Sequence, residues 1–365
     1  MNFSLFQKTK NLMLKSVEDR PTLYKKLSAL VKFFRVRREI GQILTHLHNG
    51  KIKTILIVYD TLISPPTYGD FFYTVMFARY FTSKNISVNF VIVDGDTRED
   101  WSVYNDVEKN SIMTEYMSIA RVLLDPDLAV VEVLTSPQLQ ARVRDGSAKG
   151  VYVPFRENVI NRIALYTSVM DTLNCLWSKS IQSHLDRFLL SYEELNLAVP
   201  FRKPNESYIT WGCRLSNKTA FDRNTSEENF VLIYARLKSL YPNHEIMIVS
   251  DALGCNYFKS LADKYGLTCL FSKDYSGTLM GDGGLILGSA YFFMQHCGGI
   301  IVFPWFSRVP YEMVISLVHE KPLNINKLYS WASKNQIWRS PFGGEHNLPA
   351  LELMPKRETN LQKPV

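Results

Sequence analysis

Short runs of strand-forming residues recur along this chain, and longer segments with helical spacing of apolar residues separate them. Residues 53–59 (KTILIVY), 88–93 and 207–211 are runs of this kind, rich in β-branched and aromatic side chains. Strands that alternate with helices pair in parallel and are joined by right-handed crossovers. The sequence therefore predicts an α/β protein built on parallel sheets.

The repeat of strands and helices extends over enough residues for two domains. The chain has 365 residues, and the Pro-rich stretch 200–205 (PFRKPN) separates two segments of similar pattern. The tail carries Trp331 and Trp338 and is a candidate to pack back on the first domain. We expect a basic N-terminal helical segment (1–48), a first α/β domain (49–200), a second α/β domain (205–330) and a C-terminal tail (331–365).

The positive charge of the chain is concentrated at its N-terminal end. Residues 1–40 hold ten basic and three acidic side chains, whereas the remaining residues hold 32 of each. Residues 21–48 have the pattern of a basic amphipathic helix, which can lie on an anionic membrane surface. A solvated helix packed on the first domain is the alternative. Because the rest of the chain is neutral, no nucleic-acid partner is expected.

Cysteine usage and hydropathy indicate the compartment. The five cysteines are scattered without metal-ligand spacing, which is typical of reduced thiols in a cytosolic protein. No run approaches the roughly 18 apolar residues of a membrane span, and the N-terminus lacks a signal-peptide core. We expect a cytoplasmic protein, free or peripheral on the inner face of the membrane. No G-x-G-x-x-G motif follows the first strand, so no dinucleotide cofactor is predicted, and no other cofactor is expected. No metal site is predicted either, because no cluster of His, Cys and carboxylate residues has metal-ligand spacing.

One stretch of the second domain predicts an anion-binding site. Arg214 stands where the strand at 207–211 ends, and Arg223 precedes the next helix. In open α/β sheets, ligands bind beyond the carboxyl ends of the strands, and anions bind at helix N-termini. Arg214 and Arg223 are therefore candidates for binding phosphate. Surface arginines or a local ion pair are the alternative.

The pattern also predicts where the other elements of the chain lie. In the first domain, helices are expected from near Gly69 and over 111–124. A capping box is expected at Thr225 and Glu228. The motif at 281–284 (GDGG) is expected to be a flexible loop rather than a ligand-binding one. In the second domain we expect strands over 245–250, 267–271 and 300–303, helices over 226–240, 255–265, 285–296 and 310–319, and a loop between 271 and 285.

Several short motifs stand in order along residues 50–325. They are Tyr68-Gly69-Asp70 after the first strand, Arg214 after a later one, Arg223-Asn224-Thr225 before a helix, Ser250-Asp251, and residues 306–313. Together they resemble the GT-B glycosyltransferases, which use nucleotide-sugar donors, and the local pattern is similar to that of heptosyltransferase-like and α-1,6-fucosyltransferase-like enzymes. The chain departs from the fucosyltransferases because Leu215, not a second arginine, follows Arg214.

The resemblance implies two Rossmann-like domains facing a cleft and an inverting, metal-independent transfer to a glycan or lipid-linked acceptor. Arg214 and Arg223 would offset the charge of the departing diphosphate, and Asp70 would be the base that deprotonates the acceptor hydroxyl. Asp94 and Asp96 are the next candidates for the base, and a plain helix cap is the alternative role of Asp70. The implied donor-binding residues are Arg214, Arg223, Asn224, Asp251, Ser307, Arg308, Tyr311 and Glu312, the last four near an expected loop-to-helix junction.

Other functions and roles remain open at this stage. A nucleotide-sugar epimerase of the same fold would keep the two-domain cleft, and a non-catalytic glycan-binding or assembly protein would keep the fold alone. Tyr68 and Tyr73 are expected either to line an acceptor groove or to lie in the core. His296, at the end of an expected helix, is predicted to be a cap or packing residue.

Overall fold

A computed structural model describes residues 45, 54–62, 64, 66–95, 99–144, 151–152, 185–216, 224–295, 298–314 and 337–339. The expected basic helix over 21–48 lies outside these residues apart from Thr45, which is helical and exposed. None of the helices in the described part of the chain combines the length and apolar character that a membrane crossing requires.

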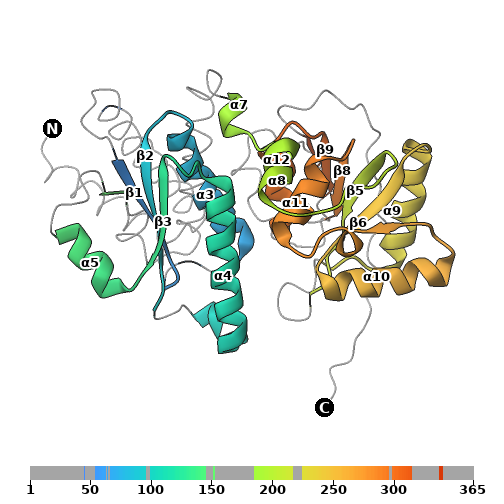
Figure 1. Cartoon of the computed structure of the whole chain (residues 1–365). Helices are drawn as coiled ribbons and strands as arrows, with labels where there is room; N and C mark the ends of the chain where they lie inside the picture. The colour runs from blue at the N-terminus through green and yellow to red at the C-terminus, as the bar shows by residue number, and fades with distance from the viewer. Residues whose placement is uncertain are drawn as a thin grey trace, which may run out of the picture.

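The first half of the protein is built on a four-stranded parallel sheet with the order β3-β2-β1-β4 (Figure 1). Residues 55–59 of β1 are buried on both faces of the sheet, as is usual where helices cover a parallel sheet. The strands are β1 (Thr54–Asp60), β2 (Ser87–Val93), β3 (Ala129–Leu134) and β4 (Val151–Tyr152), and the helices are α3 (Tyr68–Thr82), η1 (Glu99–Val103), α4 (Asp106–Leu123) and α5 (Ser136–Arg144).

Local capping determines where the two long helices of this half begin. The Thr67 hydroxyl accepts from the backbone N–H of Asp70, so α3 begins at Tyr68, close to the expected start. Asn105 and Glu108 form a capping box, so α4 begins at Asp106, five residues before the expected 111.

The second half is built on a six-stranded sheet with the order β10-β9-β8-β5-β6-β7. Its pairs are parallel except that between β10 and β9, so the expected class of two parallel-sheet α/β units is confirmed. The strands are β5 (Tyr208–Gly212), β6 (Glu245–Val249), β7 (Leu270–Phe271), β8 (Phe292–Gln295), β9 (Tyr311–Val314) and β10 (Ile337–Arg339). The helices are α9 (Glu227–Leu240), α10 (Ala252–Tyr265), η4 (Ser272–Asp274), α11 (Leu279–Leu287), η5 (Gly299–Ile301) and α12 (Val302–Trp305).

The strand β10 connects residues beyond 330 to this second sheet. Residues 337–339 pair with β9, so this part of the tail lies in the second half and not on the first domain.

The end of the second half differs from the sequence expectation. The expected loop before residue 285 contains η4 and the start of α11, and the expected helix over 285–296 contains β8. The expected strand over 300–303 is helical, and the expected helix from 310 is the strand β9. These predictions were wrong because short apolar runs fit a buried helix and a buried strand equally well.

The start of α9 also differs in detail. Its N-cap is Ser226, whose side chain accepts from the backbone N–H of Asn229, rather than Thr225 with Glu228. Thr225 is buried, and its hydroxyl accepts from the backbone N–H of Arg214. A tertiary partner therefore takes the hydroxyl that the sequence pattern assigned to the cap.

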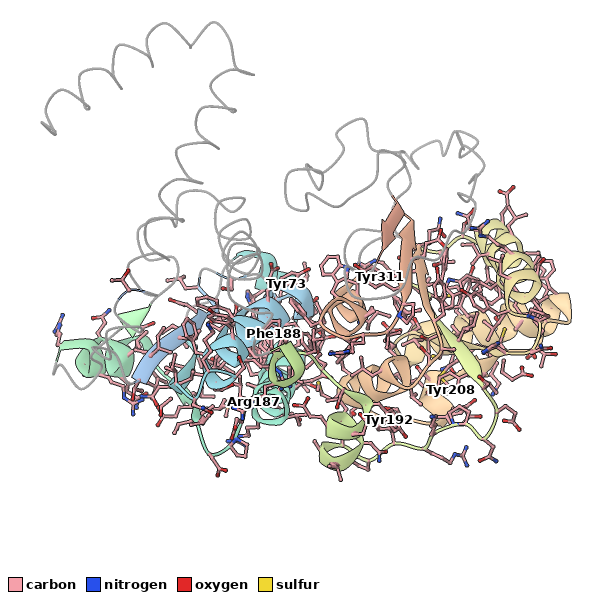
Figure 2. The ribbon with its side chains drawn as sticks, turned by 90° about the horizontal axis from the view of Figure 1, so that it is seen from above. Tyr73, Arg187, Phe188, Tyr192, Tyr208 and Tyr311 are labelled. Carbon is pink, nitrogen blue, oxygen red and sulfur yellow. The ribbon has the colours of Figure 1, made fainter. Side chains whose placement is uncertain are left out.

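Between the two sheets the chain forms α7 (Leu185–Phe188) and α8 (Tyr192–Ala198), which lie between the two halves in Figure 2. Arg79 of α3 fixes this segment, because its guanidinium donates to the carbonyls of Phe188 and Leu189 and pairs with Glu194 at 2.5 Å. On the other side α8 packs against α11. The connection is thus part of the packed structure and not a free linker.

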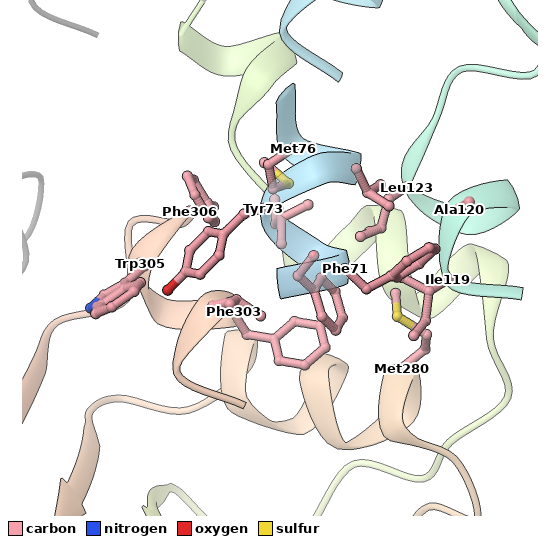
Figure 3. Packing of buried hydrophobic residues seen from close by; sticks show 14 of the residues in the cluster. Phe71, Tyr73, Met76, Ile119, Ala120, Leu123, Met280, Phe303, Trp305 and Phe306 are labelled. Carbon is pink, nitrogen blue, oxygen red and sulfur yellow. The ribbon is translucent and has the colours of Figure 1, made fainter. Parts of the chain in front are cut away.

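A single hydrophobic cluster continues from one half into the other. Residues 71–82 of α3 are all buried, since the helix is covered by the first sheet and by the second half. Tyr73 lies near Trp305 and Phe306, with ring centroids 6.0 and 6.3 Å apart (Figure 3). The helix α3 is therefore the common element of both halves.

Candidate active site

The order of the strands locates the crevice of the second sheet. From β5 the chain proceeds to β6 and β7 on one side and then returns to place β8 on the other side of β5. Ligands of open α/β sheets bind beyond the carboxyl ends of the strands at such a reversal. Arg214 follows the end of β5 and the pair Gly298-Gly299 follows the end of β8, so both flank this point.

The first sheet has a similar reversal around β1. The strands β2 and β3 lie on one side of β1, and β4 lies on the other. The helix α3 begins eight residues after β1 ends, which places its first turn at the carboxyl edge of this sheet. Asp70 is in that turn and is half-buried.

These two edges touch each other. A Cβ atom placed on Gly299 would lie 3.1 Å from Cβ of Tyr68 and 3.6 Å from the backbone nitrogen of Gly69. The loop after β8 is thus in contact with the first turn of α3, and glycine is the residue that permits this approach. The carboxyl edges of the two sheets meet at one place, next to Asp70.

Backbone bonds fix the segment that carries Arg214. The backbone N–H of Thr225 donates to the carbonyl of Arg214 at 2.8 Å, and the N–H of Arg214 donates to the Thr225 hydroxyl at 3.2 Å. The Asn224 amide accepts from the N–H of Ser216 at 2.8 Å and donates to its carbonyl at 3.0 Å. Asn224 therefore closes the base of the loop after β5, while Arg223 lies outside the described residues.

Asp70 combines a capping role with a place at the meeting point of the sheets. The Asp70 carboxylate accepts a hydrogen bond from the Thr67 hydroxyl, and the backbone N–H of Asp70 donates to the oxygen of that hydroxyl. An acid at the N-terminal turn of a helix is stabilised by the helix dipole. The capping role that the sequence left as an alternative is thus present, and Asp70 is half-buried and follows directly on Tyr68 and Gly69, which lie against Gly299.

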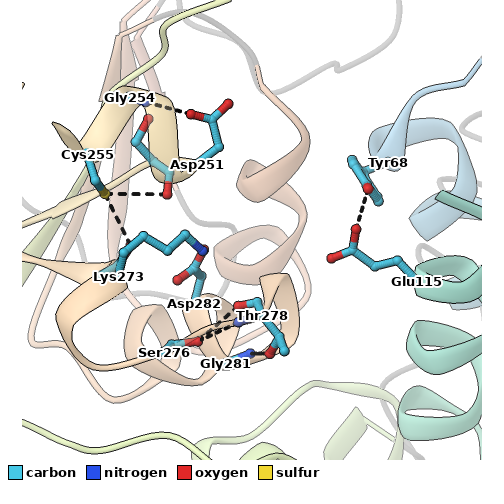
Figure 4. Close-up of polar contacts among 12 residues, drawn as sticks. Tyr68, Glu115, Asp251, Gly254, Cys255, Lys273, Ser276, Thr278, Gly281 and Asp282 are labelled. Atoms are coloured by element: carbon cyan, nitrogen blue, oxygen red, sulfur yellow. Dashed lines mark hydrogen bonds and ion pairs between the residues drawn. The ribbon is translucent and has the colours of Figure 1, made fainter. Parts of the chain in front are cut away.

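Two polar pairs lie on opposite sides of the region where the two halves meet (Figure 4). On the first half, the Tyr68 hydroxyl donates to the carboxylate of Glu115 on α4. On the second half, Lys273 pairs with Asp282 at 2.5 Å. Burial raises the pKa of Asp282 to about 6, Lys273 opposes the rise, and the charge of Glu115 adds to it. Burial and the adjacent Glu115 likewise hold the pKa of Tyr68 well above its usual range.

Local sequence pattern did not predict these two pairs. Lys273 and Asp282 fall in a segment that was expected to be a loop, and Glu115 lies on a helix of mixed polarity. Tyr68 and Glu115 belong to different helices, and Lys273 and Asp282 are nine positions apart. No local spacing in the sequence therefore indicates either pair.

Asp251 lies at the carboxyl end of β6 and is exposed. Its carboxylate accepts from the backbone N–H of Gly254 at 2.7 Å and caps α10. A Cβ on Gly254 would lie 2.0 Å from the Ser250 hydroxyl oxygen, so this turn is packed tightly. The structure thus gives Asp251 a capping role at the same edge of the sheet as Arg214.

Three of the expected donor-binding residues are not at the surface. Ser307, Tyr311 and Glu312 are buried. Tyr311 and Glu312 belong to β9, which is an inner strand of the sheet, and the Ser307 hydroxyl donates to the carbonyl of Pro304 in the turn after α12. Glu312 accepts from the hydroxyl of Tyr291 at 3.0 Å. The structure therefore does not bring these side chains to the gap, whereas Arg308 is exposed.

Of the alternative candidates for the base, Asp94 alone lies among the described residues. Asp94 is exposed at the end of β2, and Asp96 and His296 lie outside the described residues. Tyr73 is a core residue that contacts α12. Within the described ranges, no three or more His, Cys, Asp or Glu side chains are grouped so that they can hold a metal ion.

Comparison with known proteins shows distant likeness in structure alone. No family model matches the chain, and no curated protein matches it in sequence. A family 9 glycosyl transferase from Veillonella parvula is 10% identical, covers 72% of this chain and 80% of its own, and has a TM-score of 0.42. The ADP-heptose lipopolysaccharide heptosyltransferase II of Escherichia coli is 10% identical, with a TM-score of 0.38. That match covers 72% of this chain and 84% of the heptosyltransferase. The UDP-GlcNAc 2-epimerase of Neisseria meningitidis is 14% identical, with a TM-score of 0.35. That match covers 76% of this chain and 90% of the epimerase. Likeness at this level carries no functional assignment.

Proposed function

We propose that this protein is a glycosyltransferase that moves a sugar from a nucleotide-sugar donor to a glycan or lipid-linked acceptor. The observation that carries the proposal is the contact between Gly299 and Tyr68, where the carboxyl edges of the two sheets meet. A cation, Arg214, belongs to one edge and an acid, Asp70, belongs to the other. Transfer of a sugar requires both, a group that stabilises the leaving diphosphate and a base for the acceptor.

In this proposal Arg214 binds the diphosphate of the donor. A guanidinium forms short, charge-assisted bonds with phosphate oxygens, and it is always protonated at neutral pH. Thr225, which is bonded to Arg214 through the backbone, immediately precedes the N-cap of α9. The N-terminus of that helix adds partial positive charge at the same end of β5. Arg223 is the second candidate for this role.

Asp70 is proposed as the base that accepts the proton of the acceptor hydroxyl, with inversion at the sugar carbon and without a metal ion. The bond from the Thr67 hydroxyl orients the carboxylate.

The acceptor is proposed to be membrane-borne, on the evidence of the basic segment 21–48. We infer a cytoplasmic protein that is peripheral on the membrane. Deletion of residues 1–48 is expected to reduce co-sedimentation with vesicles of phosphatidylcholine and phosphatidylserine. Equal sedimentation of the full and shortened chains would remove the membrane from the proposal without affecting the donor site.

Nucleotide binding tests the donor site directly. GDP, UDP, ADP and CMP are added in turn, and the melting temperature is followed, because a ligand that binds only the folded state stabilises it. At least one nucleotide is expected to raise the melting temperature, and Arg214→Ala is expected to abolish this rise. Arg121→Ala, on the exposed face of α4, is the control and is expected to keep the rise. No stabilisation by any nucleotide in the wild type contradicts the proposal.

Sugar transfer tests the base. Asp70→Asn is expected to bind the nucleotide as the wild type does and to lose transfer by about 10²- to 10⁴-fold. An epimerase would convert UDP-GlcNAc without any acceptor, so release or epimerisation of the sugar in the absence of acceptor separates the two enzymes. Full transfer by Asp70→Asn would assign the base to another residue.

A further inference from the structure

The pair of Tyr68 and Glu115 has a feature that the proposed reaction has not used. The Tyr68 ring packs edge-on against Tyr116 at 5.6 Å, and its hydroxyl donates to Oε2 of Glu115. Among the described residues, no donor is bonded to the other oxygen of Glu115, and its side chain is half-buried. One oxygen is therefore held by Tyr68, and within the described part of the chain the other is available to accept a bond from a ligand.

The free oxygen belongs to the part of α4 that faces the second half. Figure 4 shows Glu115 opposite Thr278, which caps α11, and opposite the Lys273–Asp282 pair. The charge of Glu115 is near enough to contribute to the raised pKa of Asp282. Glu115 thus lies near these residues of the second half.

The charge of Glu115 selects the chemistry of what it can bind. Lys273 neutralises Asp282, but no ion pair with Glu115 is found in the described part of the chain. A carboxylate repels the phosphates of a nucleotide and accepts bonds only from donors. Sugar hydroxyls are such donors, and Tyr68 next to them is the kind of aromatic residue with a polar end that suits a partly buried polar site.

We propose that Glu115 is a specificity-determining residue that accepts a hydrogen bond from a sugar hydroxyl, and that Tyr68 orients its carboxylate. This inference rests on the proposed function, because it assumes a sugar next to the donor diphosphate. The sugar is that of the donor or that of the acceptor, and both present the same hydroxyl chemistry. Phosphate contacts remain with Arg214, at the end of β5.

Calorimetric titration with matched ligands tests the proposal. Glu115→Gln keeps the size of the side chain and removes its charge. The ligand pairs are UDP and UDP-glucose, ADP and ADP-glucose, and GDP and GDP-mannose, followed by methyl glucoside, methyl galactoside and methyl mannoside in the presence of the nucleotide that binds. In the wild type, the nucleotide sugar or one methyl glycoside is expected to gain affinity from this contact.

The expected result separates the two sources of the sugar. Loss of a hydrogen bond to a charged group corresponds to roughly tenfold or more in affinity. If the donor sugar is bound, Glu115→Gln loses this factor for the nucleotide sugar and keeps its affinity for the free nucleotide. If the acceptor sugar is bound, the loss appears with a methyl glycoside alone.

Two controls distinguish binding from a structural role. Asp106→Asn removes the same charge from α4 at a side chain that is 97% exposed, and it is expected to bind all probes as the wild type does. Tyr68→Phe keeps the ring against Tyr116 and removes only the hydroxyl, so it is expected to weaken the same probe by a smaller factor. An equal loss for the free nucleotide and the sugar-bearing probes, or no loss for any probe, overturns the inference. A wild type that binds no nucleotide contradicts the proposed function instead.

Discussion

Phe72 of α3 meets Phe303 of α12 edge to face, with their ring centroids 5.0 Å apart. Phe72 is fully buried in the first half and Phe303 is fully buried in the second, so this pair lies where the two halves share one core. Aromatic pairs in this geometry are more favourable than their buried area alone suggests. The stability of each half therefore depends on the other.

Phe303→Ala is expected to destabilise the whole chain by about 3–5 kcal/mol, the usual cost of removing a buried phenylalanine. Because the core is continuous, unfolding in urea is expected to remain a single transition at a lower midpoint. Intrinsic tryptophan fluorescence follows it with Trp101 in the first half and Trp211 in the second, both fully buried.

Leu197→Ala is the matched control, since Leu197 is 88% exposed and its loss is expected to change stability by less than about 0.5 kcal/mol. Two separate transitions in Phe303→Ala, with the first half unchanged, would show that the halves fold independently.

Gly283→Ala is expected to destabilise the protein although alanine favours helices. A Cβ on Gly283 would lie 2.2 Å from Cε1 of Phe303, so the ring has to move from its place in the core. Gly69→Ala is the control, because nothing lies within 4 Å of its added Cβ. This second change is expected to stabilise α3 by about 0.5–1 kcal/mol in thermal unfolding. Equal effects of the two changes would contradict the packing of α11 on α12.

Arg79→Ala is expected to cost about 3–5 kcal/mol, as the loss of one member of a buried ion pair does. It leaves Glu194 without its partner and removes donors from the carbonyls of Leu123, Phe188 and Leu189. Arg79→Lys is expected to recover little of this, since an ammonium lacks the planar fork that reaches all four groups.

Arg187→Ala is the control for Arg79, because Arg187 is exposed and bonds Asn85 at 3.2 Å. Its effect on the urea midpoint is expected to be small. A small effect of Arg79→Ala as well would mean that the segment between the halves is not fixed by this residue.

The raised pKa of Asp282 predicts a loss of stability as pH rises. The pKa moves from an ordinary value of 3.8 to about 6 in the folded protein, so the folded state holds the proton more tightly than the unfolded chain does. The contribution is complete below pH 4 and is lost between pH 4 and about 6. Two pKa units correspond to about 3 kcal/mol.

Asp282→Asn has no proton to lose in this range. The wild type loses up to about 3 kcal/mol of unfolding free energy between pH 4 and pH 7 through Asp282, and the variant does not. The difference in unfolding free energy, variant minus wild type, is therefore expected to rise by that amount. Urea unfolding at the two pH values measures the difference. A constant difference between the two proteins would show that Asp282 titrates at its ordinary pKa.

Several elements of the first half and of the start of the second half could be predicted well from local pattern. β1, α3, β5, α9 and α10 lie within a few residues of their expected bounds, because long periodic segments and caps such as Gly266 after α10 define them. The segment from 272 to 314 could not be predicted in the same way. Its runs of apolar residues are short, and whether such a run is a strand or a helix depends on what surrounds it.

The candidate site divides in a similar manner. Arg214 and Asp70 stand at strand and helix ends that the sequence indicates, so local pattern is enough to nominate both, and their roles stay predictions. Glu115, Lys273 and Asp282 were not, because their partners come from other elements or from a segment assigned as loop. Ser307 and Glu312 are both buried, Glu312 because β9 is an inner strand of its sheet.

The sequence alone determined the α/β class, the alternation of strands and helices, and the charged residues at the strand ends, since these follow from spacing and backbone geometry. Only the tertiary structure decided that α3 is shared by both halves, that Gly299 touches Tyr68, and that Glu115 faces Asp282. Contacts of this kind join residues 47 to more than 200 positions apart, and they exist because burial of apolar surface brings the two sheets together.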